Sequence, residues 1–99
     1  MKKVNIVYYS DYNDVDILLV QDNVANNIES IVQIFFNWLQ DPQNGEQFAK
    51  YTEDGLRYLC INAEEFVWWI NTVWCPCDEK AIIVEKHTIY HPEYPTGDF

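Results

Sequence analysis

The feature that most constrains the fold is a stripe of apolar residues with helical spacing between residues 24 and 39. The stripe consists of Val24, Ile28, Ile31, Val32, Phe35 and Leu39. These residues follow an i, i+3, i+4, i+7 pattern, so they lie on one side of an α-helix that must pack against an apolar surface. Asp22 or Asn23 can cap this helix, and Pro42 disfavours helical backbone at Asp41. We therefore expect one helix that ends before Asp41.

Two β-strands are expected ahead of this helix. Val4–Tyr9 is rich in β-branched and aromatic residues, and Val15–Val20 is a second apolar run. The polar residues of Ser10–Asp14 lie between them and are typical of a turn. The first 20 residues therefore predict a β-hairpin.

The middle of the chain predicts a strand followed by a second helix. Glu53-Asp54-Gly55 is a turn signal, and Leu56–Ile61 after it reads as a strand. The segment Glu46–Thr52 before the turn is ambiguous between a short helix and a strand. Asn62 can cap a helix, and Glu65 three residues later completes a capping-box pattern.

The second helix has an apolar side and one exception to it. The expected core side carries Phe66, Trp69, Ile70 and Val73, with Ala63 and Trp74 nearby. Trp68 falls on the polar side, beside Glu64 and Asn71. Either another segment covers Trp68, or it is an exposed anchor of a protein interface, where tryptophan is enriched.

Cys75-Pro76-Cys77 breaks the second helix, and Ala81–Tyr90 predicts a last strand. The order of elements favours an α+β fold in which two helices pack on a mostly antiparallel sheet of four to five strands. The ferredoxin-like order is the nearest named shape. We expect residues 1–91 to form one domain and residues 92–99, which contain Pro and Gly, to form an extended or mobile C-terminal tail.

The charge of the chain narrows its partners. Sixteen acidic residues stand against six Lys and Arg, and the net charge is −10. Phosphates would be repelled, so we expect no direct nucleic-acid binding and no binding to anionic membranes. Basic proteins are the expected partners of a chain with such a negative charge.

Three features of the sequence concern its localisation. No run is apolar enough to cross a bilayer, the start lacks a signal-peptide pattern, and the three Cys are an odd number. We therefore expect a cytoplasmic protein.

The sequence gives little support for catalysis or for a bound cofactor. Cys75 and Cys77 form a C-x-C pair, tighter than the C-x₂₋₄-C spacing of structural zinc sites. His87 and His91 are four residues apart on an expected strand, about 13 Å from one another at about 3.3 Å per residue. The acidic run at residues 11–16 lacks the central Gly of a calcium loop. We therefore expect no enzyme, no metal and no cofactor.

A small acidic α+β chain rich in Tyr and Trp resembles bacterial toxin-immunity proteins, including those of contact-dependent growth inhibition systems. Residues 55–70, a strand followed by a helix, are similar to segments of such families. The resemblance implies an antitoxin-type toxin inhibitor that acts through protein–protein interaction. It would bind and neutralise a cognate, basic nuclease toxin domain by covering its active site or its substrate path. We expect the free protein to be a monomer.

Candidate partner-binding residues are the clustered acids and the aromatic or polar residues beside them. They are Asp11, Tyr12, Asp14, Asp16, Glu53, Asp54, Glu64, Trp68, Asn71, Asp78 and Glu79. The alternative function is a nucleic-acid mimic that inhibits a DNA-binding defence protein, of the anti-restriction or anti-CRISPR type. Such a mimic needs regular rows of acids, whereas the acids of this chain come in separate clusters.

Overall fold

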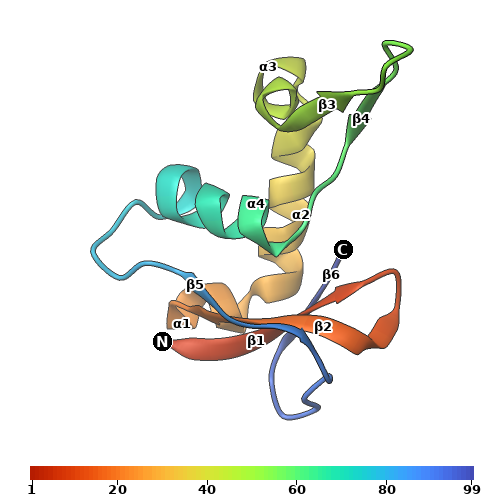
Figure 1. Cartoon of the computed structure of the whole chain (residues 1–99). Coiled ribbons are helices and arrows are strands. Elements are labelled where there is room, and N and C mark those ends of the chain that lie inside the picture. The colour runs from red at the N-terminus through yellow and green to blue at the C-terminus, as the bar shows by residue number, and fades with distance from the viewer.

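A four-stranded mixed sheet forms the base of the computed structural model, which describes residues 1–99 (Figure 1). Its strands are β1 (Lys2–Tyr8), β2 (Asp11–Val20), β5 (Ile82–Thr88) and β6 (Thr96–Asp98), in the order β5-β2-β1-β6. Strands β1 and β2 form the predicted antiparallel hairpin. Strand β5 adds antiparallel to β2, and β6 adds parallel to β1.

Helices cover one face of this sheet. They are α1 (Asp22–Asn26), α2 (Ile28–Leu39), α3 (Pro42–Gly45) and α4 (Ala63–Trp69), with a 3₁₀ turn η1 (Glu46–Phe48) and a π-helical turn η2 (Ile70–Trp74). All six residues of the predicted apolar stripe are buried. They pack with α4 and the inner face of β1 and β2 in a core of 16 buried residues. Phe35 lies at its centre, with ring centroids 5.3 Å from Phe66 and 5.2 Å from Trp69.

The first predicted helix is interrupted. Asn27 leaves helical geometry at φ −127°, ψ 29°, so α1 and α2 are separate helices. Its side-chain amide donates to the Asn23 carbonyl at 2.9 Å, and asparagine commonly competes with the helical backbone in this way. The expectation of one continuous helix was wrong, although Val24 on α1 still reaches the core.

The second helix begins as predicted and ends differently. Asn62 accepts from the Glu64 N–H at 3.0 Å, and the Glu65 carboxylate accepts from the Asn62 N–H at 3.3 Å, which confirms the capping box. The last turn is π-helical, and this wider turn shifts the side chains that follow it relative to a 3.6-residue repeat. Val73, predicted in the core, is therefore exposed.

The ambiguous segment Glu46–Thr52 contains both kinds of structure. Turn η1 is followed by β3 (Ala49–Tyr51), which pairs antiparallel with β4 (Arg57–Leu59) in a separate two-stranded sheet. The α+β class is thus confirmed. The finer expectation, two helices on a ferredoxin-like sheet, does not describe four α-helices, a mixed four-stranded sheet and a detached hairpin.

The segment expected as an extended or mobile tail belongs to the sheet. Strand β6 pairs with β1, and Gly97 is buried against α2. A Cβ at Gly97 would lie 2.9 Å from Val32 and 3.2 Å from Ile6, so only glycine lets the strand approach so closely. The loop before β6 covers the second face of the sheet, where the buried Asn5 amide donates to the carbonyls of His91 and Tyr94.

None of the helices has both the length and the apolar composition needed to span a bilayer.

Candidate protein-binding surface

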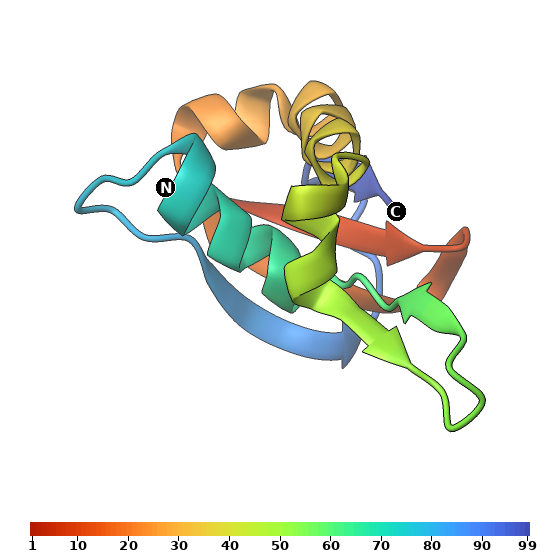
Figure 2. The ribbon, with the colours of Figure 1, turned by 90° about the horizontal axis from the view of Figure 1, so that it is seen from above.

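The hairpin of residues 49–59, which we call the arm, projects away from the main sheet (Figures 1 and 2). Every residue from 50 to 60 is exposed. Four of the exposed residues are large and apolar: Tyr51, Leu56, Tyr58 and Leu59. Leu56 is 67% exposed and Tyr58 47% exposed. Several large apolar side chains exposed on one short hairpin are typical of an interaction site in a soluble protein.

Glu46 anchors the base of the arm. Its carboxylate pairs with the Arg57 guanidinium, Nε to Oε2 3.1 Å, and accepts a hydrogen bond from the Tyr51 hydroxyl. The hydrogen bond from Tyr51 and, to a smaller extent, the hydrogen bond from Arg57 lower the pKa of Glu46. The hydrogen bond to Glu46 raises the pKa of Tyr51. Both strands of the arm are therefore tied to turn η1.

The tip of the β1–β2 hairpin lies at the same end of the molecule as the arm (Figures 1 and 2). The turn is Tyr9-Ser10 rather than the predicted Ser10–Asp14, and both residues have positive φ, 52° and 60°. A two-residue hairpin turn of this hand needs such angles, which glycine and asparagine adopt more easily than tyrosine. Tyr9 is 94% exposed. Tyr9 thus combines an unfavourable backbone conformation with a fully exposed aromatic ring, which makes it a candidate contact residue. Tyr9 is not among the site residues predicted from the sequence.

A hollow of about 490 Å³, which we call the acidic hollow, lies between this tip, β4, β5 and the start of α4. Its lining residues are Tyr8, Tyr9, Asp14, Asp16, Tyr58, Leu59, Cys60, Ile61, Asn62, Glu64, Lys86 and His87. Three predicted site residues, Asp14, Asp16 and Glu64, meet there although they are up to 50 positions apart. A second, more apolar hollow of about 540 Å³ lies between the arm, the β1–β2 tip and the end of α2.

A bulge in β5 brings the side chains of Lys86 and His87 to the acidic hollow. Val15 pairs with Thr88 and Ile17 with Glu85, so Lys86 and His87 together oppose Asp16. His87 has a positive φ of 54°. Lys86 forms an ion pair with Glu64, and His87 Nδ1 lies 2.8 Å from Asp14 Oδ1. All four of these side chains are about half exposed or more, so water screens both pairs.

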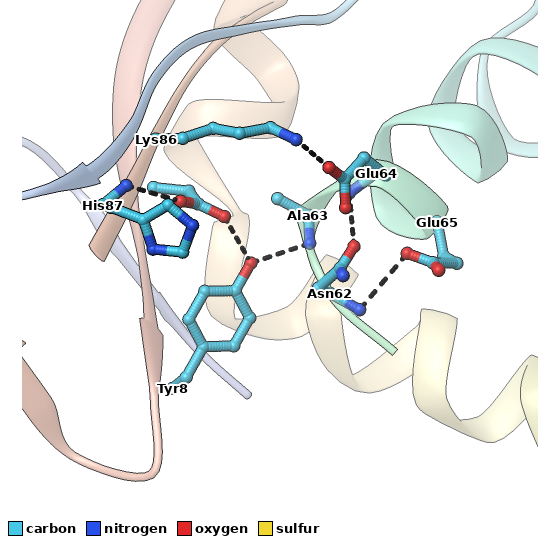
Figure 3. A network of polar contacts seen from close by, with 8 residues as sticks. Tyr8, Asn62, Ala63, Glu64, Glu65, Lys86 and His87 are labelled. Atoms are coloured by element: carbon cyan, nitrogen blue, oxygen red, sulfur yellow. Dashed lines mark hydrogen bonds and ion pairs between the residues drawn. The ribbon is translucent and has the colours of Figure 1, made fainter. Parts of the chain in front are cut away.

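Asp16 has a different role from its neighbours. It is 7% exposed, and its carboxylate accepts from the Tyr8 hydroxyl at 2.7 Å and from the His87 N–H at 3.1 Å (Figure 3). The Tyr8 oxygen in turn accepts from the Ala63 N–H at 2.7 Å, an amide at the start of α4 that has no partner within the helix. Burial and, to a smaller extent, the hydrogen bond to Asp16 raise the pKa of the Tyr8 hydroxyl, which therefore stays protonated. These contacts join α4 to the sheet, so we treat Asp16 as structural.

Trp68 lies at the base of the arm. It is 40% exposed, so the segments that contact it cover it only in part. Its ring packs edge-on against Phe48 at 5.5 Å and lies 6.4 Å from Trp38. Glu64 lies one turn earlier on the same face of α4, since residues four apart are neighbours on a helix. Trp68 therefore extends the surface that the arm and the acidic hollow begin.

The remaining predicted residues lie in three other places. Asp11 and Tyr12 are exposed at the start of β2, where the Tyr12 ring packs edge-on against Tyr90. Glu53 and Asp54 are exposed at the tip of the arm.

Asn71 lies in η2, and Asp78 and Glu79 lie in the loop of residues 75–80 that follows it, at the end of the molecule opposite the arm (Figures 1 and 2). Asn71 uses its side-chain amide to bond both backbone groups of Ala81, at 2.9 and 2.7 Å. Asp78 and Glu79 are exposed in that loop, away from the arm. The structure does not bring these three residues to the surface described above.

No group of three or more His, Cys, Asp or Glu side chains is arranged to hold a metal ion. Comparisons of the chain with protein-family models, with curated proteins and with solved structures gave no match.

Proposed function

We propose that this protein is an immunity-type inhibitor that binds a basic toxin domain, in the first instance a nuclease, through the end of the molecule that carries the arm. The observation that supports this most is the meeting of two hairpins there. They present exposed apolar side chains, among them Tyr9, Leu56 and Tyr58, around the carboxylates of the acidic hollow. The chain as a whole carries a net charge of −10.

The surface at the arm end combines aromatic side chains with acidic side chains around them, as many protein interfaces do. A few aromatic anchors that lose all their water supply most of the binding energy, and charged residues at the rim set the association rate. Tyr58 and Trp68 are the anchors in this proposal, and Asp14 and Glu64 are the rim acids. Because Lys86 is itself exposed, a lysine or arginine of a partner can replace it as the counter-charge of Glu64, and another can pair with the exposed Asp14 carboxylate.

A nuclease is the fitting partner because it uses basic side chains to hold phosphates. A surface that binds those side chains would also block the path of the nucleic acid. The acids of this protein lie at separate places, in the hollow, at the arm tip and in the 75–80 loop, rather than in one row. This distribution favours a protein partner over mimicry of a nucleic acid.

The first test is capture of the partner with tagged protein from a lysate of the source organism at low salt, followed by identification and an activity assay. Equimolar capture of one basic toxin domain, together with loss of its nuclease activity, is the expected result. Capture of a large DNA-binding protein that competing DNA releases would instead support the mimic and overturn the proposal.

The second test maps the surface with matched variants. We expect Trp68→Ala and Tyr58→Ala each to weaken the complex by about 2 kcal/mol, roughly 30-fold in Kd. Trp74→Ala is the control, because Trp74 is 39% exposed like Trp68 but stacks on Trp69 instead. Equal losses for Trp68→Ala and Trp74→Ala would remove the arm end from the interface.

Charge variants test the rim separately. Asp14→Asn and Glu64→Gln should slow association and reduce its salt dependence. Asp78→Asn and Glu79→Gln remove the same charge at the opposite end and should leave association within about twofold. A larger effect at Asp78 and Glu79 would move the interface to the 75–80 loop.

A further inference from the structure

The Cys75-Pro76-Cys77 turn brings two thiols together. The Cys77 N–H donates to the Cys75 carbonyl at 2.8 Å, which closes a three-residue turn around Pro76. The proline ring fixes φ near the value that the central residue of such a turn needs. The turn therefore folds the first and third residues back toward each other, and their Sγ atoms lie 3.5 Å apart.

The two sulfurs have unequal surroundings. The Gln21 side chain, 6% exposed, donates from Nε2 to Cys77 Sγ at 3.4 Å. The Cys75 thiol donates to the same sulfur. Both hydrogen bonds lower the pKa of Cys77, and the contact with Cys77 raises the pKa of Cys75. The thiolate, which is the nucleophilic form, is therefore more favoured at Cys77 than at Cys75.

The pair is also accessible. Cys75 and Cys77 are both partly exposed, at the end of the molecule opposite the arm. The third cysteine, Cys60, is exposed and has no thiol neighbour in the structure. Cys60 therefore serves as an internal reference for a single exposed thiol.

We propose that Cys75 and Cys77 form a thiol–disulfide exchange site for small-molecule disulfides, for which glutathione disulfide is the probe. In the first step the Cys77 thiolate attacks one sulfur of the probe, whose S–S bond breaks, and one glutathione thiolate leaves. In the second step Cys75 loses its proton to solvent and attacks Cys77 Sγ, and the second glutathione thiolate leaves. The protein dithiol is oxidised by two electrons to a Cys75–Cys77 disulfide, and the probe is reduced to two thiols.

The test starts from fully reduced Cys60→Ser protein exposed to glutathione disulfide under anaerobic conditions, with acid quenching, alkylation and mass spectrometry of the peptides. The expected product is an internal Cys75–Cys77 disulfide, with a protein-bound glutathione adduct only as a transient species. In C60S/C75S the reaction should stop at a stable adduct on Cys77. In C60S/C77S the adduct on Cys75 should form at least about tenfold more slowly.

The protein with Cys60 alone, C75S/C77S, measures the rate of an isolated exposed thiol, and circular dichroism confirms that each variant is folded. Three outcomes would overturn the proposal. They are stable separate adducts on both cysteines, a disulfide between two protein molecules in place of the internal one, or adduct formation on Cys77 no faster than on Cys75 and Cys60.

Discussion

Replacing Tyr8 by Phe removes one hydroxyl from the joint between the sheet and α4. That hydroxyl donates to the buried Asp16 carboxylate and accepts from the Ala63 N–H, each at 2.7 Å. The ring stays in place because Phe has nearly the same shape, so the change is confined to hydrogen bonding. Asp16 loses one donor, and the Ala63 N–H loses its only acceptor.

The cost follows from these two losses. A hydrogen bond to a charged group contributes about 1.5–3 kcal/mol, and a buried donor left without a partner costs about 1–3 kcal/mol. Because Tyr8 is only partly buried, water compensates for some of this, and we expect a net loss of about 2–3 kcal/mol in the free energy of unfolding. This is a large part of the stability of a small domain, about 5–15 kcal/mol, but the variant should still fold.

Urea unfolding followed by tryptophan fluorescence measures this loss. Tyr12→Phe is the matched control, since Tyr12 lies on the same hairpin and its hydroxyl has no hydrogen bond in the structure; its stability should change by less than about 0.5 kcal/mol. Asp16→Asn and the double variant complete a thermodynamic cycle, in which we expect a coupling energy of about 1–2 kcal/mol. A coupling near zero would refute the role given to the Tyr8–Asp16 contact.

The same hydroxyl predicts a pH dependence. Its pKa is raised above the ordinary value of 10.0 in the folded state, so its contribution is fully present below pH 10 and is lost as pH rises above it. The stability difference between wild type and Tyr8→Phe should therefore shrink above pH 10. Linkage sets a ceiling of about 1.4 kcal/mol per pH unit, and screening at a partly exposed group reduces this to about 0.5–1 kcal/mol. A difference that is constant from pH 8 to 11 would contradict the assignment.

Three further predictions concern single elements. Gly97→Ala should cost about 1–3 kcal/mol, measured by urea unfolding, because the new Cβ meets Val32 at 2.9 Å; an unchanged midpoint would mean that β6 does not pack on α2. Asn62→Ala should cost about 1 kcal/mol by losing the cap of α4, and Asn62→Asp should restore most of it in the same assay. Glu46→Ala should free the arm, so that limited proteolysis within residues 49–59 accelerates several-fold while the global unfolding midpoint stays unchanged; protection equal to wild type would show that the Arg57 and Tyr51 contacts do not hold the arm.

The sequence predicts most of the elements that are determined by residues close to one another in the chain. The stripe from Val24 to Leu39, the capping box at Asn62 and the β1–β2 hairpin all depend on neighbours within a few positions. The errors have local causes too. The polar residues after Ser10 resemble a turn more than Tyr9-Ser10 does, and neither the backbone at Asn27 nor the π-turn that exposes Val73 leaves a distinct pattern in the composition.

The candidate surface is less predictable because it is assembled over long distances. The clustering of acids in the sequence predicts Asp14 and Glu64 as site residues, but only the bulge in β5 explains why Lys86 and His87 face them. Acidity alone cannot separate these residues from Asp16, which is structural, or from Asp78 in a distant loop. Leu56 and Tyr58 are exposed because the arm is separate from the main sheet. The sequence of a strand does not show which sheet the strand joins, so this exposure could not be predicted.

The pairing of β1 with β6 has a consequence for how the protein is made. Asn5 bonds Thr96 across 91 positions, so the second partner of the first strand is synthesised only after nearly every other element. Contacts of such sequence separation slow folding, because the chain must close a long loop before the contact stabilises it. During synthesis the edge of β1 that pairs with β6 therefore stays unpaired until residues 96–98 leave the ribosome. The part of α2 that contacts Gly97 also stays exposed until then. Unpaired strand edges and exposed apolar surface favour aggregation, so a premature stop before β6 should give a chain that aggregates more readily than the full-length protein.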